Sequence, residues 1–335
     1  MKEKRAAPAT VDGVLCRIAT QGDYQAVLDI NRNVYNGLDY LSSKYHEYLN
    51  DPRRNLGVAI VDGRIVVFEM AYVIDGDTSI TWQARRVHKD FQGLGLSNKL
   101  GHYLQSILKE RYPKLKREHY TSANWPLISK VLSKRPKEKL VMKRPRVSFD
   151  TNPTDLNQIL KNQSKKQEDL IDALKKIHVL SIEEGVVALK NCDWSSLFPT
   201  GFLIANWEPY MIQYASNYPL FLQDSTMVAT RDKSGQVESI SFGTIINSPA
   251  ALRYRADYYG NSEQDAIHHI VKHAVLISQL DQKRDISYSI LLPETLDKQA
   301  IKDFVVTKMG LTNQRTDENL ALLISLPPRN FLSKM

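Results

Sequence analysis

The sequence predicts an α/β protein made of two lobes, each built on a mixed β-sheet. Strand-like stretches of period two alternate with helical stretches in the first half, and the same order of elements recurs in the second half. A length of 335 residues exceeds one ordinary core and suits two domains of about 150 residues. We expect a disordered lead-in over 1–13, a first lobe over 14–149, a connector over 150–170 and a second lobe over 171–335.

The first lobe is expected to open with a strand and two helices and to continue as a three-stranded meander. Asp-Gly turns at 62–63 and 75–77 separate the strands of the meander. Apolar residues at helical spacing then predict a long helix from Leu96 onward. The expected elements, in order, are a strand over 14–20, a helix over 20–35 capped by Thr20 or Asp23, a helix over 42–51, strands within 55–87, a helix ending near Pro113, a strand over 117–122, a helix over 124–134 and a strand pair around 139–149.

The second half repeats this order. Its expected elements are strands at 226–232, 238–247 and 251–261, a helix over 263–280, a strand over 285–293, a helix over 297–310 and a strand over 319–326. The helix over 263–280 is predicted to bury Ala266, Ile267, Ile270, Val271, Ala274 and Val275. His269 and His273 lie one turn apart, but they have no obvious third metal ligand, so we expect them on the helix surface.

Composition excludes several classes of protein. A hydrophobic content of 42% with 24% charged residues is ordinary for a globular chain, and no apolar run reaches the roughly 18 residues of a membrane span. The polar start lacks the apolar segment of a secretory signal, and Cys16 and Cys192 form no disulfide framework, so we expect a cytoplasmic protein. The net charge of +8 indicates an anionic partner. Basic residues concentrate at 109–117 and 134–146, and no stacking aromatics interleave the second run, so nucleic acid is not expected.

A glycine turn joins the last strand of the meander to the long helix. Backbone N–H groups at such a helix start bind phosphate oxygens. The turn lacks the Gly-Lys-Ser/Thr ending of a Walker A loop, and Asn98 stands where a dinucleotide-binding fingerprint needs glycine. It follows instead the pattern Q/R-x-x-G-x-G/A, with Ser97 in the last position, and resembles the pyrophosphate loop of the GNAT superfamily of acetyl-CoA-dependent N-acetyltransferases. The predicted order of elements is also the one found in that superfamily.

The run Y-x-G-L-D-Y-L-x-x-x-Y-H over residues 35–46 narrows the resemblance to the histidine N-acetyltransferase family, and a weaker similarity resumes at 203–210. The resemblance implies a GNAT fold and transfer of acetyl from acetyl-CoA to the α-amine of L-histidine or of another small amino acid. It also implies a small-molecule partner, no membrane and no metal, and we expect a monomer. The second lobe is predicted to be a degenerate copy without a coenzyme site, because its turn at 258–263 has one glycine and an acidic residue.

The resemblance assigns roles to particular residues. Backbone N–H groups of Arg85, Arg86 and Val87 would face the pantetheine and the acetyl carbonyl. The pyrophosphate would be held by the turn, which consists of Gln92, Gly93, Leu94, Gly95, Leu96 and Ser97, and Asn124 is a further cofactor-binding candidate. Many GNAT enzymes place a tyrosine general acid seven residues beyond such an asparagine, but that position is Val131 here. The acid could be Tyr120 or water, or the thiolate could leave unassisted.

Glu69 is the candidate base, because it is the carboxylate of an otherwise apolar strand and burial would raise its pKa. Alternatively it faces solvent or pairs with Arg86; such a pair could also bind a zwitterionic amino acid. The alternation of the strand places Ile80, Trp82, Ala84 and Arg86 on one face and Thr81, Gln83, Arg85 and Val87 on the other.

Tyr35, Asp39 and Tyr40 are candidates for the acceptor wall, and Trp207 and Tyr210 are candidate contacts from the second lobe. Core packing is the alternative for all five residues. Three other functions stay open: an enzyme for a different small amine, a protein or peptide acetyltransferase, and a catalytically inactive module that binds coenzyme A or nucleic acid.

Overall fold

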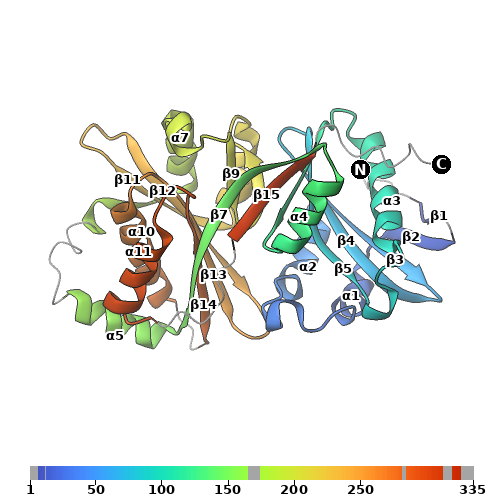
Figure 1. Ribbon diagram of the computed structural model, residues 1–335, viewed down its shortest axis with the longest axis horizontal. Helices are drawn as coiled ribbons and strands as arrows, with labels where there is room; N and C mark the ends of the chain where they lie inside the picture. The colour runs from blue at the N-terminus through green and yellow to red at the C-terminus, as the bar shows by residue number, and fades with distance from the viewer. Residues whose placement is uncertain (1–6, 12, 165–173, 281–283, 312–318, 326–335) are drawn as a thin grey trace.

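The computed structural model describes residues 7–11, 13–164, 174–280, 284–311 and 319–325. The two predicted lobes lie side by side (Figure 1), and the predicted α/β architecture is confirmed. Thirteen strands form one continuous mixed sheet in the order β1-β2-β3-β4-β5-β6-β15-β7-β14-β13-β12-β11-β8. The strands β9 and β10 form a separate hairpin.

The first half follows the predicted order closely. Its strands are β1 (Ala9–Val11), β2 (Val14–Ile18), β3 (Arg54–Val61), β4 (Arg64–Ile74), β5 (Ser79–Val87), β6 (Arg117–Ser122) and β7 (Glu138–Thr151). Its helices are α1 (Tyr24–Asp29), α2 (Leu41–Asn50), α3 (Leu96–Arg111) and α4 (Trp125–Lys134), with short 3-10 turns at Gln21–Asp23, Val34–Gly37 and Lys89–Phe91.

The second half repeats the arrangement and adds the hairpin. Its strands are β8 (Ile177–Leu180), β9 (Phe202–Ala205), β10 (Glu208–Met211), β11 (Ser225–Arg231), β12 (Val237–Asn247), β13 (Leu252–Tyr259), β14 (Ile286–Leu291) and β15 (Asn319–Ser325). Its helices are α5 (Pro153–Ser164), α7 (Ile182–Asn191), α8 (Trp194–Leu197), α9 (Tyr218–Leu222), α10 (Glu263–Ser278) and α11 (Lys298–Asp303), which a π-helical turn at Phe304–Lys308 continues; a 3-10 turn lies at Ala215–Asn217.

Helices cover both faces of the first-half sheet. On one face α3 packs so closely on β3 that a side chain at Gly57 would meet Leu100 and Leu104 at 3.0 Å, which explains the glycine in a central strand. On the other face, Tyr45 of α2 packs in one apolar cluster with Phe68 of β4. The candidate site lies at the open end of the sheet, between these two layers of helices.

The two lobes exchange strands in the middle of the molecule. The last described strand, β15, pairs with β6 and with β7 and so completes the sheet of the first half (Figure 1). The far end of β7 pairs in turn with β14 of the second half. The predicted boundary between 14–149 and 171–335 is therefore wrong in one respect, because each half contains a strand from the other.

Several local predictions were also wrong. Residues 9–11 of the expected lead-in form β1, because their backbone pairs with β2. The connector begins as α5, whose Leu156 is fully buried in the core beneath α10, while 165–170 lie outside the described residues. The helix expected over 20–35 ends at Asp29, and the strand pair near 139–149 is the single strand β7.

His269 and His273 are fully buried rather than on the surface of α10. A chain of hydrogen bonds satisfies both rings: Ser241 Oγ lies 2.7 Å from Nδ1 of His269 and 2.7 Å from Nε2 of His273, and Tyr254 Oη lies 2.7 Å from Nδ1 of His273. Thr230 completes the chain at 3.0 Å from Nε2 of His269. Burial lowers the pKa of both imidazoles, that of His273 to about 3.

None of the helices in the described part of the chain combines the length and the apolar character that a membrane crossing requires. Among the same residues, no three His, Cys, Asp or Glu side chains gather as a metal site would need. The two histidines of α10 are held by hydroxyl groups, which accounts for their proximity without a metal.

Candidate functional site

The strands β5 and β6 separate along their length. They pair in parallel only where Ser79–Thr81 faces Arg117–His119. Beyond these residues β5 runs on to Val87 and β6 to Ser122 without pairing with each other. A strand directs its backbone groups alternately to either side, so amide and carbonyl groups of β5 point into this gap. Arg85, Arg86 and Val87, predicted to face a pantetheine chain, lie on this free edge.

The glycine turn follows β5 at the mouth of the gap. Gly93 and Gly95 have positive φ angles of 79° and 73°, and a side chain at either would meet nothing within 4 Å. Within the described structure the amides of Gly93, Leu94 and Gly95 donate to no backbone oxygen. Gly95 is the N-cap of the sixteen-residue helix α3, so free N–H groups and the positive end of the helix dipole face the same space. The arrangement can bind a diphosphate.

The corresponding place in the second lobe is closed. There β13 and β14 stay paired from Leu252 with Ile286 to Asp257 with Leu291, so no gap opens. Side chains of Tyr258 and Ser239 fill the space above Gly260. Ser262 caps α10 through Asp265 N at 3.1 Å, and Glu263 and Asp265 place negative charge in the first turn. Among the described residues, only the first lobe therefore has an open glycine turn of this kind at the start of a long helix.

A β-bulge changes which side chains of β5 face each other across the sheet. Ala84 has a φ of 55°, and together with Arg85 it stands opposite Glu69 of β4. The predicted alternation is therefore wrong beyond Gln83, because the extra residue reverses the faces. Arg85, not Arg86, pairs with Glu69: its Nε lies 2.7 Å and its Nη2 2.5 Å from Oε1. Glu69 is fully buried and faces Gly101 of α3.

Arg86 points to the opposite face, where its Nη2 donates to Asp39 Oδ1 at 2.6 Å. Both side chains are buried, and Arg86 Nη1 has no hydrogen-bond partner. Asp39 also accepts from Leu41 N at the start of α2. The bulge thus separates the predicted pair Glu69–Arg86 and creates two pairs on two faces of the sheet.

The loop before α2 is held in an uncommon conformation against the second lobe. Tyr35 and Asn36 have φ angles of 52° and 55°, which cost energy in residues other than glycine. Gly37 has a φ of 81°, and a side chain there would approach the Cβ of Ala250 to 2.9 Å. Arg253 Nη1 donates to Leu38 O at 2.7 Å. The sequence run over 35–46 therefore encodes a contact between the lobes as well as the start of α2.

The hairpin of β9 and β10 brings a carboxylate from the second lobe to the same face. Glu208 pairs with Arg54 of β3, with 2.8 Å between Oε1 and Nη1. The Arg54 guanidinium stacks 3.6 Å from the ring centre of Tyr72, and Tyr210 Oη donates to Glu208 Oε2 at 2.6 Å. Burial alone would raise the pKa of Glu208, but the Arg54 charge outweighs it and lowers this pKa. Tyr210 is thus part of a packed ionic cluster, while Tyr40 is half-buried beside it.

The turn of this hairpin reaches β6 where the gap begins. Asn206 and Trp207 have φ angles of 50° and 71°, which suits the twist of a tight hairpin but strains a tryptophan. Trp207 O accepts from Thr121 Oγ1 at 2.7 Å, and Asn206 N donates to Asp257 Oδ2 at 2.9 Å. The turn is therefore fixed between β6 of one lobe and β13 of the other.

Tyr120 and Asn124 lie on the far wall of the gap. Tyr120 is half-buried on β6 and packs with Ile128 of α4. Asn124 is the N-cap of α4, and its Oδ1 accepts from Leu127 N at 3.0 Å. A capping role therefore explains this asparagine, and Val131 lies within α4.

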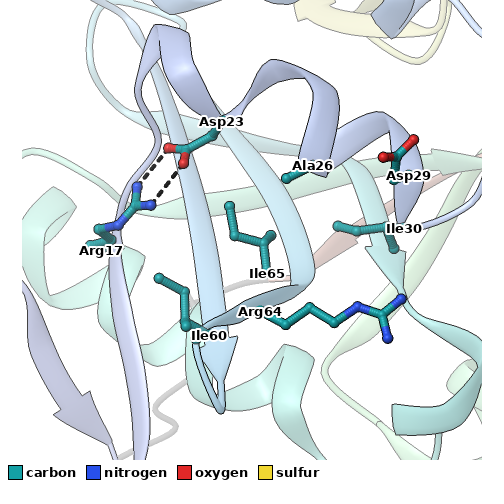
Figure 2. A pocket seen from close by; sticks show the side chains of 9 residues that line it. Arg17, Asp23, Ala26, Asp29, Ile30, Ile60, Arg64 and Ile65 are labelled. Atoms are coloured by element: carbon teal, nitrogen blue, oxygen red, sulfur yellow. Dashed lines mark hydrogen bonds and ion pairs between the residues drawn. The ribbon is translucent and has the colours of Figure 1, made fainter.

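A cavity of about 500 Å³ lies elsewhere, between α1 and the hairpin of β3 and β4 (Figure 2). Its polar groups are already paired: Arg17 donates to both carboxylate oxygens of Asp23, at 2.6 and 2.8 Å. None of the residues predicted for catalysis or binding lines it. This cavity is not a candidate for the site.

Sequence reasoning missed the residues that the second lobe contributes. Glu208 and Asp257 belong to strands that the sequence did not relate to the gap, Asn206 lies in the turn between β9 and β10, and Arg54 gave no signal beyond its charge. The similarity at 203–210 marked the right segment, but only the exchange of strands explains why that segment lies beside β6.

Comparison with known proteins agrees with this architecture. Residues 179–282 match the family model described as histidine N-acetyltransferase, C-terminal. The chain is 32% identical over 99 residues to Probable N-acetyltransferase 16 from Homo sapiens and 29% identical over 99 residues to Histidine N-acetyltransferase from Xenopus tropicalis. Each match covers 30% of this chain, but only 27% and 31% of the respective relatives, so it spans less than a third of their length.

Solved structures extend the likeness to the whole fold. A GCN5-related N-acetyltransferase from Sphaerobacter thermophilus aligns with a TM-score of 0.51 at 10% identity, covering 96% of this chain and 98% of that one. A Saccharomyces cerevisiae N-myristoyltransferase with bound myristoyl-CoA and inhibitors aligns with a TM-score of 0.55 at 10% identity, covering 97% and 84%. The chain thus has the fold of GNAT acyltransferases, and it resembles histidine N-acetyltransferases in part of its sequence.

Proposed function

We propose that the protein is an acetyl-CoA-dependent N-acetyltransferase that acetylates the α-amine of a small amino acid, with L-histidine as the first candidate. The observation that carries this proposal is the gap between β5 and β6 with an exposed glycine turn at its mouth. The partial similarity to histidine N-acetyltransferases supports the choice of acceptor.

Coenzyme A fits the residues present. The free amides of Gly93, Leu94 and Gly95 would receive its pyrophosphate, and the unpaired edge of β5 would hydrogen-bond the pantetheine and the acetyl carbonyl. The acceptor amine attacks the thioester carbon, a tetrahedral intermediate forms, and the carbon–sulfur bond breaks as the thiolate leaves. The amine loses one proton and the thiolate gains one, so a base and an acid are both useful.

Glu69 is the proposed base and Tyr120 the proposed acid. Glu69 lies on β4 and pairs with Arg85 of β5, while Tyr120 lies on β6, across the gap from β5. Glu69→Gln is expected to lower kcat by about 100-fold or more, the usual contribution of a positioned base, while leaving coenzyme A affinity within about threefold. Steady-state kinetics and calorimetry measure both quantities. Glu110→Gln on the exposed side of α3 is the control, and an unchanged kcat for Glu69→Gln would remove this residue from the mechanism.

Gly95→Val tests the diphosphate site. The φ of 73° is strained for valine, and the added side chain would occupy the space in which a phosphate must approach the amides. We expect affinity for coenzyme A to fall by about 100-fold, because several charge-assisted hydrogen bonds are lost. Isothermal titration calorimetry measures this. Gly13→Val has a similar positive φ and open surroundings but lies far along the chain, so it reports the cost of backbone strain alone.

The decisive experiment is incubation with acetyl-CoA and pooled amino acids, followed by mass spectrometry of the products. The proposal expects one N-acetylated amino acid to dominate, and omitting L-histidine from the pool identifies the acceptor. Binding of coenzyme A without any acetylated product would instead favour an inactive binding module.

A further inference from the structure

Arg255 of β13 is a buried cation that no described residue pairs with directly. Its residue is 6% exposed, yet its guanidinium forms neither a hydrogen bond nor an ion pair with any described residue, and its Nε is buried without a partner. Burial and the nearby Arg253 charge lower the pKa of Arg255. An arginine left unsatisfied in this way is costly unless something else supplies the missing acceptor.

The surroundings of Arg255 place it at the acceptor side of the site. Its guanidinium lies 4.8 Å from the ring centre of Trp207, whose carbonyl is bonded to Thr121 of β6 beside the gap. Arg253, two residues before Arg255 on the same strand, has its guanidinium 5.9 Å from the ring centre of Tyr35 in the loop before α2. Arg255 therefore lies near the turn of the β9–β10 hairpin, the free part of β6 and the loop before α2, which are the three segments expected on the acceptor side.

A second unpaired donor lies at the same place. Trp207 Nε1 is buried and has no hydrogen-bond partner in the part of the chain that the structure describes, and it belongs to the ring that the guanidinium covers. Asp257, two residues along the same face of β13, carries the opposite charge and counteracts the lowering of the Arg255 pKa. It forms no ion pair or hydrogen bond with Arg255 in the described structure, and its Oδ2 accepts from Asn206 N. Two unpaired donors and a strained turn that holds one of them in place are what recognition of an anion requires.

We propose that Arg255, assisted by the indole N–H of Trp207, binds the α-carboxylate of the acceptor amino acid. This inference rests on the proposed function and makes it narrower: the second lobe selects acceptors that carry a carboxylate beside the amine. Amines of the same shape without a carboxylate would leave both donors unsatisfied and would be rejected.

The test compares L-histidine with histamine, which lacks only the carboxylate. The wild-type protein is expected to acetylate L-histidine with a kcat/KM about 100-fold or more above that for histamine, since charged hydrogen bonds are lost with the carboxylate. In Arg255→Gln the value for L-histidine should fall by about 100-fold, while that for histamine stays within about threefold. Trp207→Phe keeps the ring and removes the donor, and we expect a smaller loss of about tenfold, again for L-histidine alone.

Controls separate recognition from folding. Arg231→Gln removes the same charge from β11, where the guanidinium donates to Gly235 O in an exposed turn. This variant should leave kcat/KM unchanged for both substrates. Arg255→Gln should keep the melting temperature and the coenzyme A affinity, because no hydrogen bond of Arg255 is lost. An equal loss for both acceptors in Arg255→Gln would mean that the residue acts on packing, and the proposal would fail.

The outcomes also distinguish this proposal from the proposed function. Equal use of histamine and L-histidine by the wild type would overturn the carboxylate site but leave acetyl transfer standing. Coenzyme A binding without transfer to either would contradict the proposed function. In that case, melting temperatures measured with coenzyme A present test the carboxylate site separately. The site is supported if L-histidine raises the melting temperature of the wild type, histamine does not, and Arg255→Gln abolishes the effect of L-histidine. Equal effects of L-histidine and histamine on the wild type would overturn it.

Discussion

A chain that ends at Leu311 is expected to lose its cooperative fold in both lobes. The truncation removes β15, which fills the sheet between β6 and β7 and buries Leu320 and Leu322. Burial of two leucines and two ladders of backbone hydrogen bonds together contribute more than about 5 kcal/mol, a large part of the usual 5–15 kcal/mol of a domain. Circular dichroism and thermal unfolding measure the loss.

A chain that ends at Ser325 is the comparison, since it keeps β15. Leu322→Asp tests the same contact by placing a charge at a fully buried position of β15, whereas Val179→Asp alters the exposed edge strand β8 and should be tolerated. A cooperative melting transition in the chain ending at Leu311 would contradict the view that the first lobe depends on its last strand.

Stability is expected to fall steeply as the pH drops below about 6.5. Burial lowers the pKa of His119 and of His273 to about 3, and that of His269 well below its ordinary value of 6.5. Below pH 6.5 these three histidines therefore bind protons in the unfolded chain but stay neutral in the folded chain. The stabilisation is present above the unfolded pKa and is lost as the pH falls, by about 1.4 kcal/mol per pH unit for each histidine. Between pH 6.5 and 5 the three together lose about 5 kcal/mol, because at pH 6.5 the unfolded histidines are only half protonated and the slope there is half its full value.

Carboxyl groups oppose part of this loss. Burial raises the pKa of Asp257 to about 6 and also raises that of Asp75, which lies 3.9 Å from Nδ1 of His119. These two groups take up protons on folding, so they favour the folded state as the pH falls, and the net change is several kcal/mol.

Urea unfolding at half-unit steps from pH 7.5 to 5 measures the slope. The double variant His269→Gln/His273→Gln should start less stable, because its hydrogen-bond chain is broken, but its slope should be smaller by up to about 2.7 kcal/mol per pH unit. His178→Gln, at an exposed position of β8, should leave the slope unchanged. Should the wild type itself show no decline between pH 6.5 and 5, the burial of these rings would not be the controlling factor.

Local patterns predicted most elements, because strands, turns and helices leave periodic signals in the sequence. The glycine turn was predictable for the same reason, since it depends on one short segment from β5 to α3. The gap between β5 and β6 was expected only from the family resemblance, because it depends on β6, which lies outside that segment. The exchange of β15 was not predictable, because the stretch over 319–326 reads as a strand wherever it pairs.

Two further errors have specific causes. The bulge at Ala84 carries no glycine or asparagine to mark its positive φ, so strict alternation assigned Arg86 to the wrong face. His269 and His273 looked like surface residues because the hydroxyl groups that satisfy them come from β11, β12 and β13, which lie outside the helix pattern. In both cases the deciding contacts come from residues that are not neighbours in sequence.

The late position of β15 also affects how the chain is made. During synthesis the first half leaves the ribosome long before residues 319–325 exist, and until then β6 and β7 have no strand between them. The sheet that carries the glycine turn can close only after residues 319–325 have been synthesised. The nascent protein therefore gains its binding-competent form only after the second half has been made, rather than lobe by lobe, and a polypeptide terminated before β15 has no finished first half.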